Sequence, residues 1–170
     1  MAFRNLEDIL IVDPRFLGIC TQRDGAVCQM ELADLHAEIA RIQLSSSVPG
    51  EVRSVFDRAR STLLYAYFDY DLLVVGETQA FGAVEFALKQ RLNGHGDATR
   101  GTLRNLVDRA RKAGIFPLRT PKSHGMTDQI EALIELRNGL SHGTAAVHLP
   151  GMALDIVEIC AQVINHIYSI

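Results

Sequence analysis

The segment 135–143 contains the residue types in this chain that are best suited to chemistry. An arginine, an asparagine, a serine and a histidine lie close together there, as Arg137, Asn138, Ser141 and His142. A guanidinium binds anions through several donors, and an imidazole exchanges protons near neutral pH. The segment therefore predicts anion binding combined with acid–base chemistry. The alternative is structural, because Asn, Ser and His also suit a helix end, where a protonated His complements the helix dipole.

The spacing of apolar residues predicts that this segment belongs to a helix. Its apolar arc is formed by Ile130, Leu133, Ile134, Leu136 and Leu140. Arg137 falls inside this arc, where a guanidinium is costly unless it is paired or faces a cleft. Arg137 and His142 are separated by about 140° around a straight helix, so one straight helix would not aim both at the same small target. Either the helix ends near Gly139, or two copies of the chain combine across a symmetric interface.

The string Arg137-Asn138-Gly139-Leu140-Ser141-His142 resembles the R-N-x3-H signature of HEPN domains, a family of small α-helical domains. Residues 85–92 also resemble the second helix of these domains, and residues 103–115 resemble their next helix. The resemblance covers about residues 51–168. It implies an all-α, HEPN-like bundle of five to six helices.

The resemblance also implies a metal-independent endoribonuclease that needs no cofactor and works as a homodimer with two facing motifs. In such an enzyme a ribose 2′-OH attacks the adjacent phosphate and leaves a 2′,3′-cyclic phosphate end. His142 would act as general base or acid, and Arg137 would stabilise the phosphate. Asn138 would orient the histidine or bind the phosphate, and Ser141 would support either residue.

Two further implications of the resemblance concern biological setting. Toxin and host-defence roles are common in the family, so an antitoxin or another regulatory protein is an expected partner beside RNA. Many members are also thought to have lost catalysis. The alternative function is therefore a non-catalytic dimerisation, interaction or RNA-binding module in which the motif is structural.

Two glutamates are candidates to hold Arg137. Glu77 falls on the apolar stripe of its expected helix, and Glu85 borders that stripe. Either carboxylate could pair with the guanidinium. The alternative is that Glu77 is favoured at a helix start by the dipole and that Glu85 is solvated.

A basic window lies between residues 100 and 122 in an otherwise acidic chain. It holds one acidic residue, Asp108, beside Arg109 and six candidate RNA-binding residues: Arg100, Arg104, Arg111, Lys112, Arg119 and Lys122. Clustered bases of this kind could contact the phosphates of RNA. The alternative is a solvated helix face in which Asp108 forms ion pairs with Arg104 and Lys112, each four residues away.

Periodicity places helices at about 31–44, 52–70, 77–92, 99–113, 127–141 and 150–168, with Gly76 kinking or separating the second and third. Gly114 is placed to end the fourth helix, and Thr127 to begin the fifth. Residues 8–14 could form a short extended piece, and residues 23–25 a turn. We divide the chain into an N-terminal extension with a short helix, residues 1–45, and a HEPN-like helical domain, residues 46–170.

Composition is ordinary for a globular protein. The 170 residues are 48% hydrophobic and 22% charged, with a formal net charge of −3, which argues against disorder. No stretch reaches the roughly 20 apolar residues of a membrane span, so no membrane partner is expected. Cys20, Cys28 and Cys160 have no zinc-site or disulfide spacing and predict reduced thiols in a cytoplasmic protein without a bound metal.

Overall fold

The fold is described by a computed structural model for residues 4–93, 101–120, 128–141 and 146–169. These residues contain six α-helices, α1 (Leu32–Arg41), α2 (Gly50–Tyr65), α3 (Leu72–Asn93), α4 (Leu103–Lys112), α5 (Gln129–Ser141) and α6 (Pro150–Ile167). The prediction of an all-α bundle of five to six helices is confirmed.

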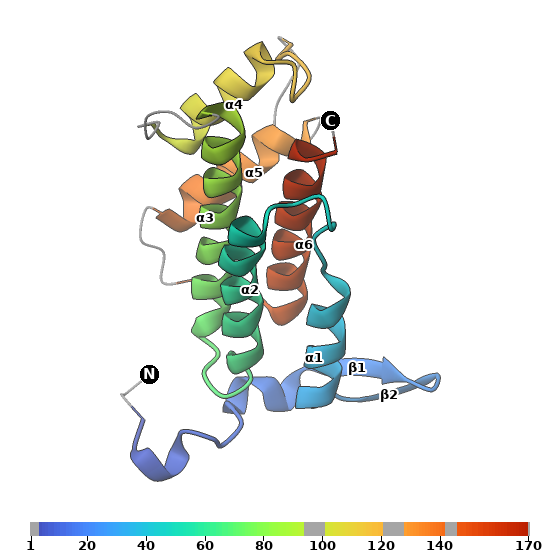
Figure 1. The fold of residues 1–170 in the computed structure, drawn as a ribbon. Coiled ribbons are helices and arrows are strands. Elements are labelled where there is room, and N and C mark those ends of the chain that lie inside the picture. Colours follow the sequence, from blue (N-terminus) through green and yellow to red (C-terminus); the bar gives the residue numbers. More distant parts are fainter. Residues whose placement is uncertain (1–3, 94–100, 121–127, 142–145, 170) are drawn as a thin grey trace.

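The long helices α2, α3 and α6 stand side by side and form the centre of the bundle (Figure 1). Helix α4 lies across one end, α5 packs beside α3 and α6, and α1 lies at the opposite end near the N-terminal segment. Within the described part of the chain, no helix combines the length and the apolar character needed to cross a bilayer.

Helices α2 and α3 approach each other closely at Gly76. This glycine lies inside α3, which runs without interruption from Leu72, so the helix does not break at Gly76. A Cβ at Gly76 would lie 2.8 Å from the Cδ2 atom of Leu63 on α2. The glycine is therefore a packing residue that lets two helices meet.

Helix α4 ends as the sequence predicted. Gly114 has a positive φ of 78°. Its amide donates to the Arg111 carbonyl, and the Ile115 amide donates to the Ala110 carbonyl. This pattern of two backbone bonds around a left-handed glycine is a Schellman motif, and it turns the chain sharply away from α4.

The N-terminal region differs from the expectation of one extended piece at residues 8–14. Its regular elements are two 3-10 helices, η1 (Leu6–Asp8) and η2 (Pro14–Gly18), and an antiparallel hairpin, β1 (Cys20–Arg23) and β2 (Ala26–Gln29). The predicted turn at 23–25 is confirmed. Asp24 and Gly25 both have positive φ angles, as a two-residue hairpin loop requires.

The N-terminal extension and the helical domain share one hydrophobic core. Phe16 and Leu35 from the extension are fully buried in the same cluster as Leu63, Leu88 and Ile164. Residues 1–45 thus contribute side chains to the bundle interior.

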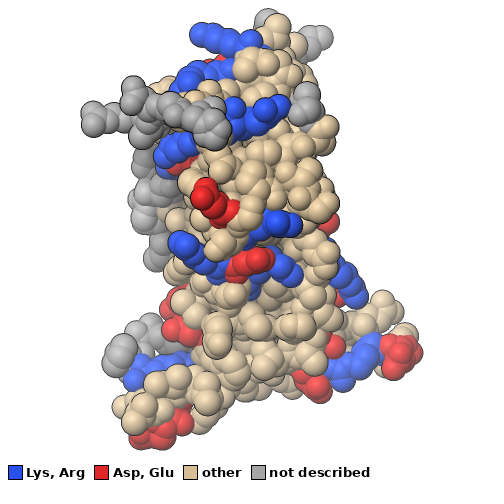
Figure 2. All heavy atoms as spheres, in the orientation of Figure 1, with Lys and Arg blue, Asp and Glu red and all other residues tan. Residues whose placement is uncertain are grey.

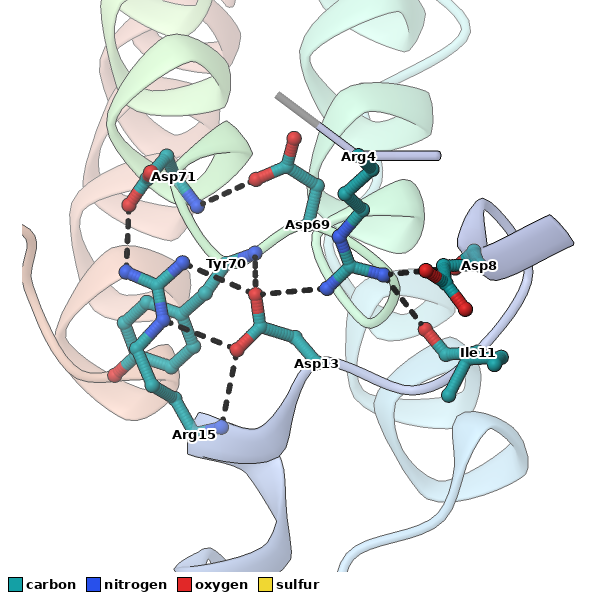
Figure 3. A network of polar contacts seen from close by, with 8 residues as sticks. All are labelled: Arg4, Asp8, Ile11, Asp13, Arg15, Asp69, Tyr70 and Asp71. Carbon is teal, nitrogen blue, oxygen red and sulfur yellow. Dashed lines mark hydrogen bonds and ion pairs between the residues drawn. The ribbon is translucent and has the colours of Figure 1, made fainter. Parts of the chain in front are cut away.

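A buried carboxylate fastens the extension to the turn between α2 and α3 (Figure 3). Asp13 is fully buried and accepts hydrogen bonds from the guanidinium groups of Arg4 and Arg15 and from the Tyr70 amide. Arg15 also pairs with Asp71 at 2.6 Å and lies over the Tyr70 ring. The network therefore joins residues 4–15 to residues 70–71, which are distant in sequence.

Candidate functional site

Arg137 is held by a carboxylate of the neighbouring helix. Its Nη2 atom on α5 donates to Oε1 of Glu85 on α3 at 3.0 Å. Both side chains are partly exposed, at 30% for Arg137 and 18% for Glu85. The ion pair explains how a guanidinium can lie within the apolar arc, and it identifies Glu85 as the partner among the two candidate carboxylates.

The remaining residues of the predicted motif are only partly described. Asn138 is exposed on α5. Helix α5 continues past Gly139 to Ser141, so the possibility that it ends near Gly139 is not realised. His142 lies outside the described residues. The approach of His142 to Arg137, in one copy or between two, therefore stays a prediction.

Glu77 makes a different contact from the one considered for it. It is fully buried on α3, and its Oε2 atom lies 2.9 Å from Nδ1 of His148, in the segment that precedes α6. Burial raises the pKa of Glu77, although the hydrogen bond and positive charge of His148 act in the opposite direction. Glu77 is thus the partner of His148, and not of Arg137.

A groove with a volume of about 560 Å³ lies between α5 and the segment that precedes α6. It is lined by Ala132, Glu135, Leu136, Gly139, Leu140, Ala146 and His148. Gly139 leaves the backbone open there, since a Cβ at this position would meet no atom within 4 Å among its neighbours. The groove therefore borders both the motif helix and the Glu77–His148 pair.

Three of the predicted RNA-binding residues converge on one buried carboxylate. Glu131 on α5 is only 1% exposed. It forms ion pairs with Arg104 at 2.8 Å, Arg111 at 3.1 Å and Arg119 at 3.6 Å. Arg111 also pairs with Asp128. These contacts join α4 and the following segment to α5.

This arrangement bears on the predicted RNA-binding set. Arg111 is only 4% exposed and pairs with Asp128 and Glu131, so the described residues give it a structural contact, and its RNA-binding role stays a prediction. Arg104 is tied to Glu131 and not to Asp108. Lys112 is exposed and Arg119 is 56% exposed, and both keep their candidate role. Arg100 and Lys122 lie outside the described residues.

Sequence reasoning missed two features of this region. The sequence gives no signal that singles out His148, because its partner Glu77 comes from a helix that is distant in sequence. The role of Asp128 was also missed, since Thr127 was expected to cap α5 and lies outside the described residues. Asp128 Oδ1 accepts the amides of Ile130 and Glu131, which is the bonding of an N-cap.

The described residues offer little for a metal ion. Within 4–93, 101–120, 128–141 and 146–169, no group of three or more His, Cys, Asp or Glu side chains is placed to bind one. Comparison with known proteins adds no assignment: no family model, no curated protein and no solved structure matches this chain.

Proposed function

We propose that this protein is a metal-independent endoribonuclease of the HEPN type. The observation that carries the proposal is the position of Arg137, a partly exposed guanidinium that Glu85 orients from the adjacent helix. Asn138, the next residue of the HEPN-like string, is exposed on α5. An oriented guanidinium is the group needed where the negative charge of a phosphate grows in a transition state.

The proposed reaction needs only proton transfer and charge stabilisation. The ribose 2′-oxygen attacks the adjacent phosphorus and gives its proton to a general base. The bond from phosphorus to the 5′-oxygen breaks, and that oxygen takes a proton from a general acid. His142 fills one or both roles, and Arg137 binds the phosphate oxygens. The products are a 2′,3′-cyclic phosphate end and a 5′-hydroxyl end.

The outward face of α5 supports the proposed homodimer. Leu136, 36% exposed, lies one turn before Gly139, which has no side chain. Two copies related by a two-fold axis could place each leucine over the glycine of the other, because a two-fold interface pairs one patch with itself. Such packing would bring two motif helices together and would supply two copies of His142, one as base and one as acid.

Basic side chains at the α4 end of the molecule provide a surface for the RNA backbone. In Figure 2, blue Lys and Arg spheres predominate at this end, whereas acids and bases mix around the N-terminal end. Among the described members of the predicted set, Lys112 and Arg119 are exposed. We propose that they contact phosphates outside the cleavage site. Replacing them would lower the affinity for RNA and make that affinity less dependent on salt concentration.

The proposed setting is the cytoplasm, where RNA is available and thiols stay reduced. A toxin or host-defence role, with an antitoxin or another regulatory protein as partner, follows from the resemblance alone and belongs to the same proposal.

RNA cleavage in EDTA tests the proposed activity. The purified chain and its Arg137→Ala and His142→Ala variants are incubated with RNA, and fragments are resolved on denaturing gels. Arg53→Ala and His36→Ala are matched controls, because both residues are exposed on other helices. We expect the wild type and controls to cleave, and the motif variants to lose about a hundredfold or more in rate.

The alternative is a non-catalytic interaction module. The observation that favours it is again the Arg137–Glu85 ion pair, since a pair between α5 and α3 also has a structural use. Intact RNA in every sample, with Arg137→Ala less stable than the wild type, would support this module and reject the nuclease.

A further inference from the structure

Glu77 is an unusual residue in the interior of the bundle. It is fully buried on α3, and its Oε1 atom is buried without a hydrogen-bond partner. Its Oε2 atom lies 2.9 Å from Nδ1 of His148. A buried ion pair is often no more stable than an apolar pair of similar volume. Stability of the fold therefore gives no reason for a carboxylate here, and local costs of this kind are expected at functional sites.

The contact with Glu77 determines how His148 presents its imidazole ring. When Glu77 is ionised, its carboxylate accepts the proton of Nδ1, and the neutral ring then has its lone pair on Nε2. The His148 side chain is 24% exposed and lines the groove beside α5. A buried carboxylate that holds one ring nitrogen, with the other nitrogen available as an acceptor, is the arrangement that makes a histidine a general base.

The lining of the groove favours the uncharged part of a nucleotide. Leu136 and Leu140 give it apolar walls, whereas Glu135 contributes a carboxylate. This carboxylate repels a phosphate but can accept hydrogen bonds from the amino group of a base. The volume of about 560 Å³ lies within the range of about 300–1,000 Å³ for small-molecule sites. The base and ribose of one nucleotide therefore fit the groove, with the phosphate outside it.

Arg137 lies beside the groove, where it can bind that phosphate. Leu140 lines the groove and follows Arg137 by three residues on α5. Residues three apart on a helix are neighbours on one face. The guanidinium is held by Glu85 at 3.0 Å and is 30% exposed, so it keeps donors for a phosphate attached to a ribose in the groove.

We propose that His148 is the general base of RNA cleavage and that Glu77 is its positioning residue. The inference rests on the proposed nuclease and names the proton acceptor at that site. Nε2 of His148 takes the proton of the ribose 2′-hydroxyl as the 2′-oxygen forms its bond to phosphorus. The bond from phosphorus to the 5′-oxygen breaks, and that oxygen takes a proton from the general acid, the role left to His142. Glu77 stays ionised and stabilises the imidazolium that forms.

Single-turnover RNA cleavage in EDTA tests the two roles. The variants are His148→Ala, Glu77→Gln and the control His36→Ala, an exposed histidine on α1. We expect His148→Ala to cleave about a hundredfold more slowly or worse, and Glu77→Gln about tenfold more slowly or worse, while both bind an uncleavable 2′-O-methyl RNA as tightly as the wild type. Glu77→Gln should be slower although removal of its buried charge makes the fold more stable, which a purely structural role does not predict.

Two further measurements identify the base. Imidazole added to the buffer should restore part of the cleavage by His148→Ala, but none by Arg137→Ala. At the mapped cleavage position, an RNA with sulfur in place of the leaving 5′-oxygen needs little help from a general acid, because a thiolate is a better leaving group than an alkoxide. The defect of His148→Ala should persist with this RNA.

The outcomes separate this inference from the nuclease. A wild type that cleaves RNA beside an equally active His148→Ala would leave the nuclease intact and overturn only the inference. So would a His148→Ala variant that imidazole does not restore, or one that cleaves the sulfur-containing RNA at the wild-type rate. A wild type that leaves RNA intact would reject the nuclease, and the assignment of its base with it. Circular dichroism of each variant confirms that it is folded.

Discussion

Replacing Asp13 with alanine tests whether the N-terminal segment is fastened by a buried ion-pair network. The carboxylate is fully buried and accepts bonds of 3.0 Å from Arg15 Nε, Arg15 Nη2 and the Tyr70 amide, and of 3.2 Å from Arg4 Nη2. Removing one partner of a buried pair costs about 3–5 kcal/mol. Arg4 and Arg15 are 20% and 36% exposed and can be partly hydrated. We therefore expect a loss of about 3 kcal/mol.

Urea denaturation followed by circular dichroism measures this loss. Asp71→Ala is the matched control, because Asp71 also pairs with Arg15 but is 50% exposed, and an exposed pair contributes about 1 kcal/mol or less. If Asp13→Ala cost no more than the control, the network would not fasten the segment, and the reasoning would be refuted.

The pH dependence of stability gives a second test of Asp13. Burial raises the pKa of this carboxyl, but hydrogen bonds from Arg15 and from the Tyr70 amide outweigh burial and hold the pKa well below its ordinary value. A carboxyl whose pKa is lowered in the folded state stabilises the protein at pH values above its ordinary pKa, and this contribution is lost as pH falls. Acidification below about pH 4 should therefore reduce the stability of the wild type more than that of Asp13→Ala.

Three further substitutions test the site and the packing around it. Glu85→Gln removes the charge that orients Arg137 and should lower the single-turnover rate of RNA cleavage about tenfold, the equivalent of one charge-assisted bond. Glu77→Gln should raise the free energy of unfolding at pH 7 by about 1 kcal/mol, because it removes a buried charge with an unpartnered oxygen. Burial raises the pKa of Glu77, so the wild-type protein loses stability as pH rises and this carboxyl ionises. The gain of Glu77→Gln should therefore vanish in acid, where the wild-type carboxyl is protonated. Gly76→Ala should cost about 1–3 kcal/mol in thermal unfolding, because its Cβ would press on Leu63.

The helices could be predicted because their signals are local. Apolar periodicity located α2 and α6, and Gly114 marked the end of α4. Gly76 was misread for a physical reason: a glycine inside a helix weakens the helical signal, and only the neighbouring helix shows why it is there. The short strands β1 and β2 were missed because four residues are too few to show alternation, although the turn between them was recognised.

The candidate site was predictable in composition but not in pairing. The apolar arc of α5 predicted that Arg137 is paired or faces a cleft, yet Glu77 and Glu85 were both candidate partners on one helix. Only the packing of α5 against α3 places Glu85 beside the guanidinium. The convergence of three arginines on Glu131 was hidden for the same reason, since side chains from α4 and the following segment meet it only in the folded chain.

The chemical nature of the cleaved RNA ends tests the central claim most directly. Mass spectrometry of the fragments formed by the wild type in EDTA identifies both new termini. Attack by the 2′-oxygen predicts a 2′,3′-cyclic phosphate on one fragment and a 5′-hydroxyl on the other. Fragments with 3′-hydroxyl and 5′-phosphate ends, or fragments that Arg137→Ala produces as fast as the wild type, would contradict the account.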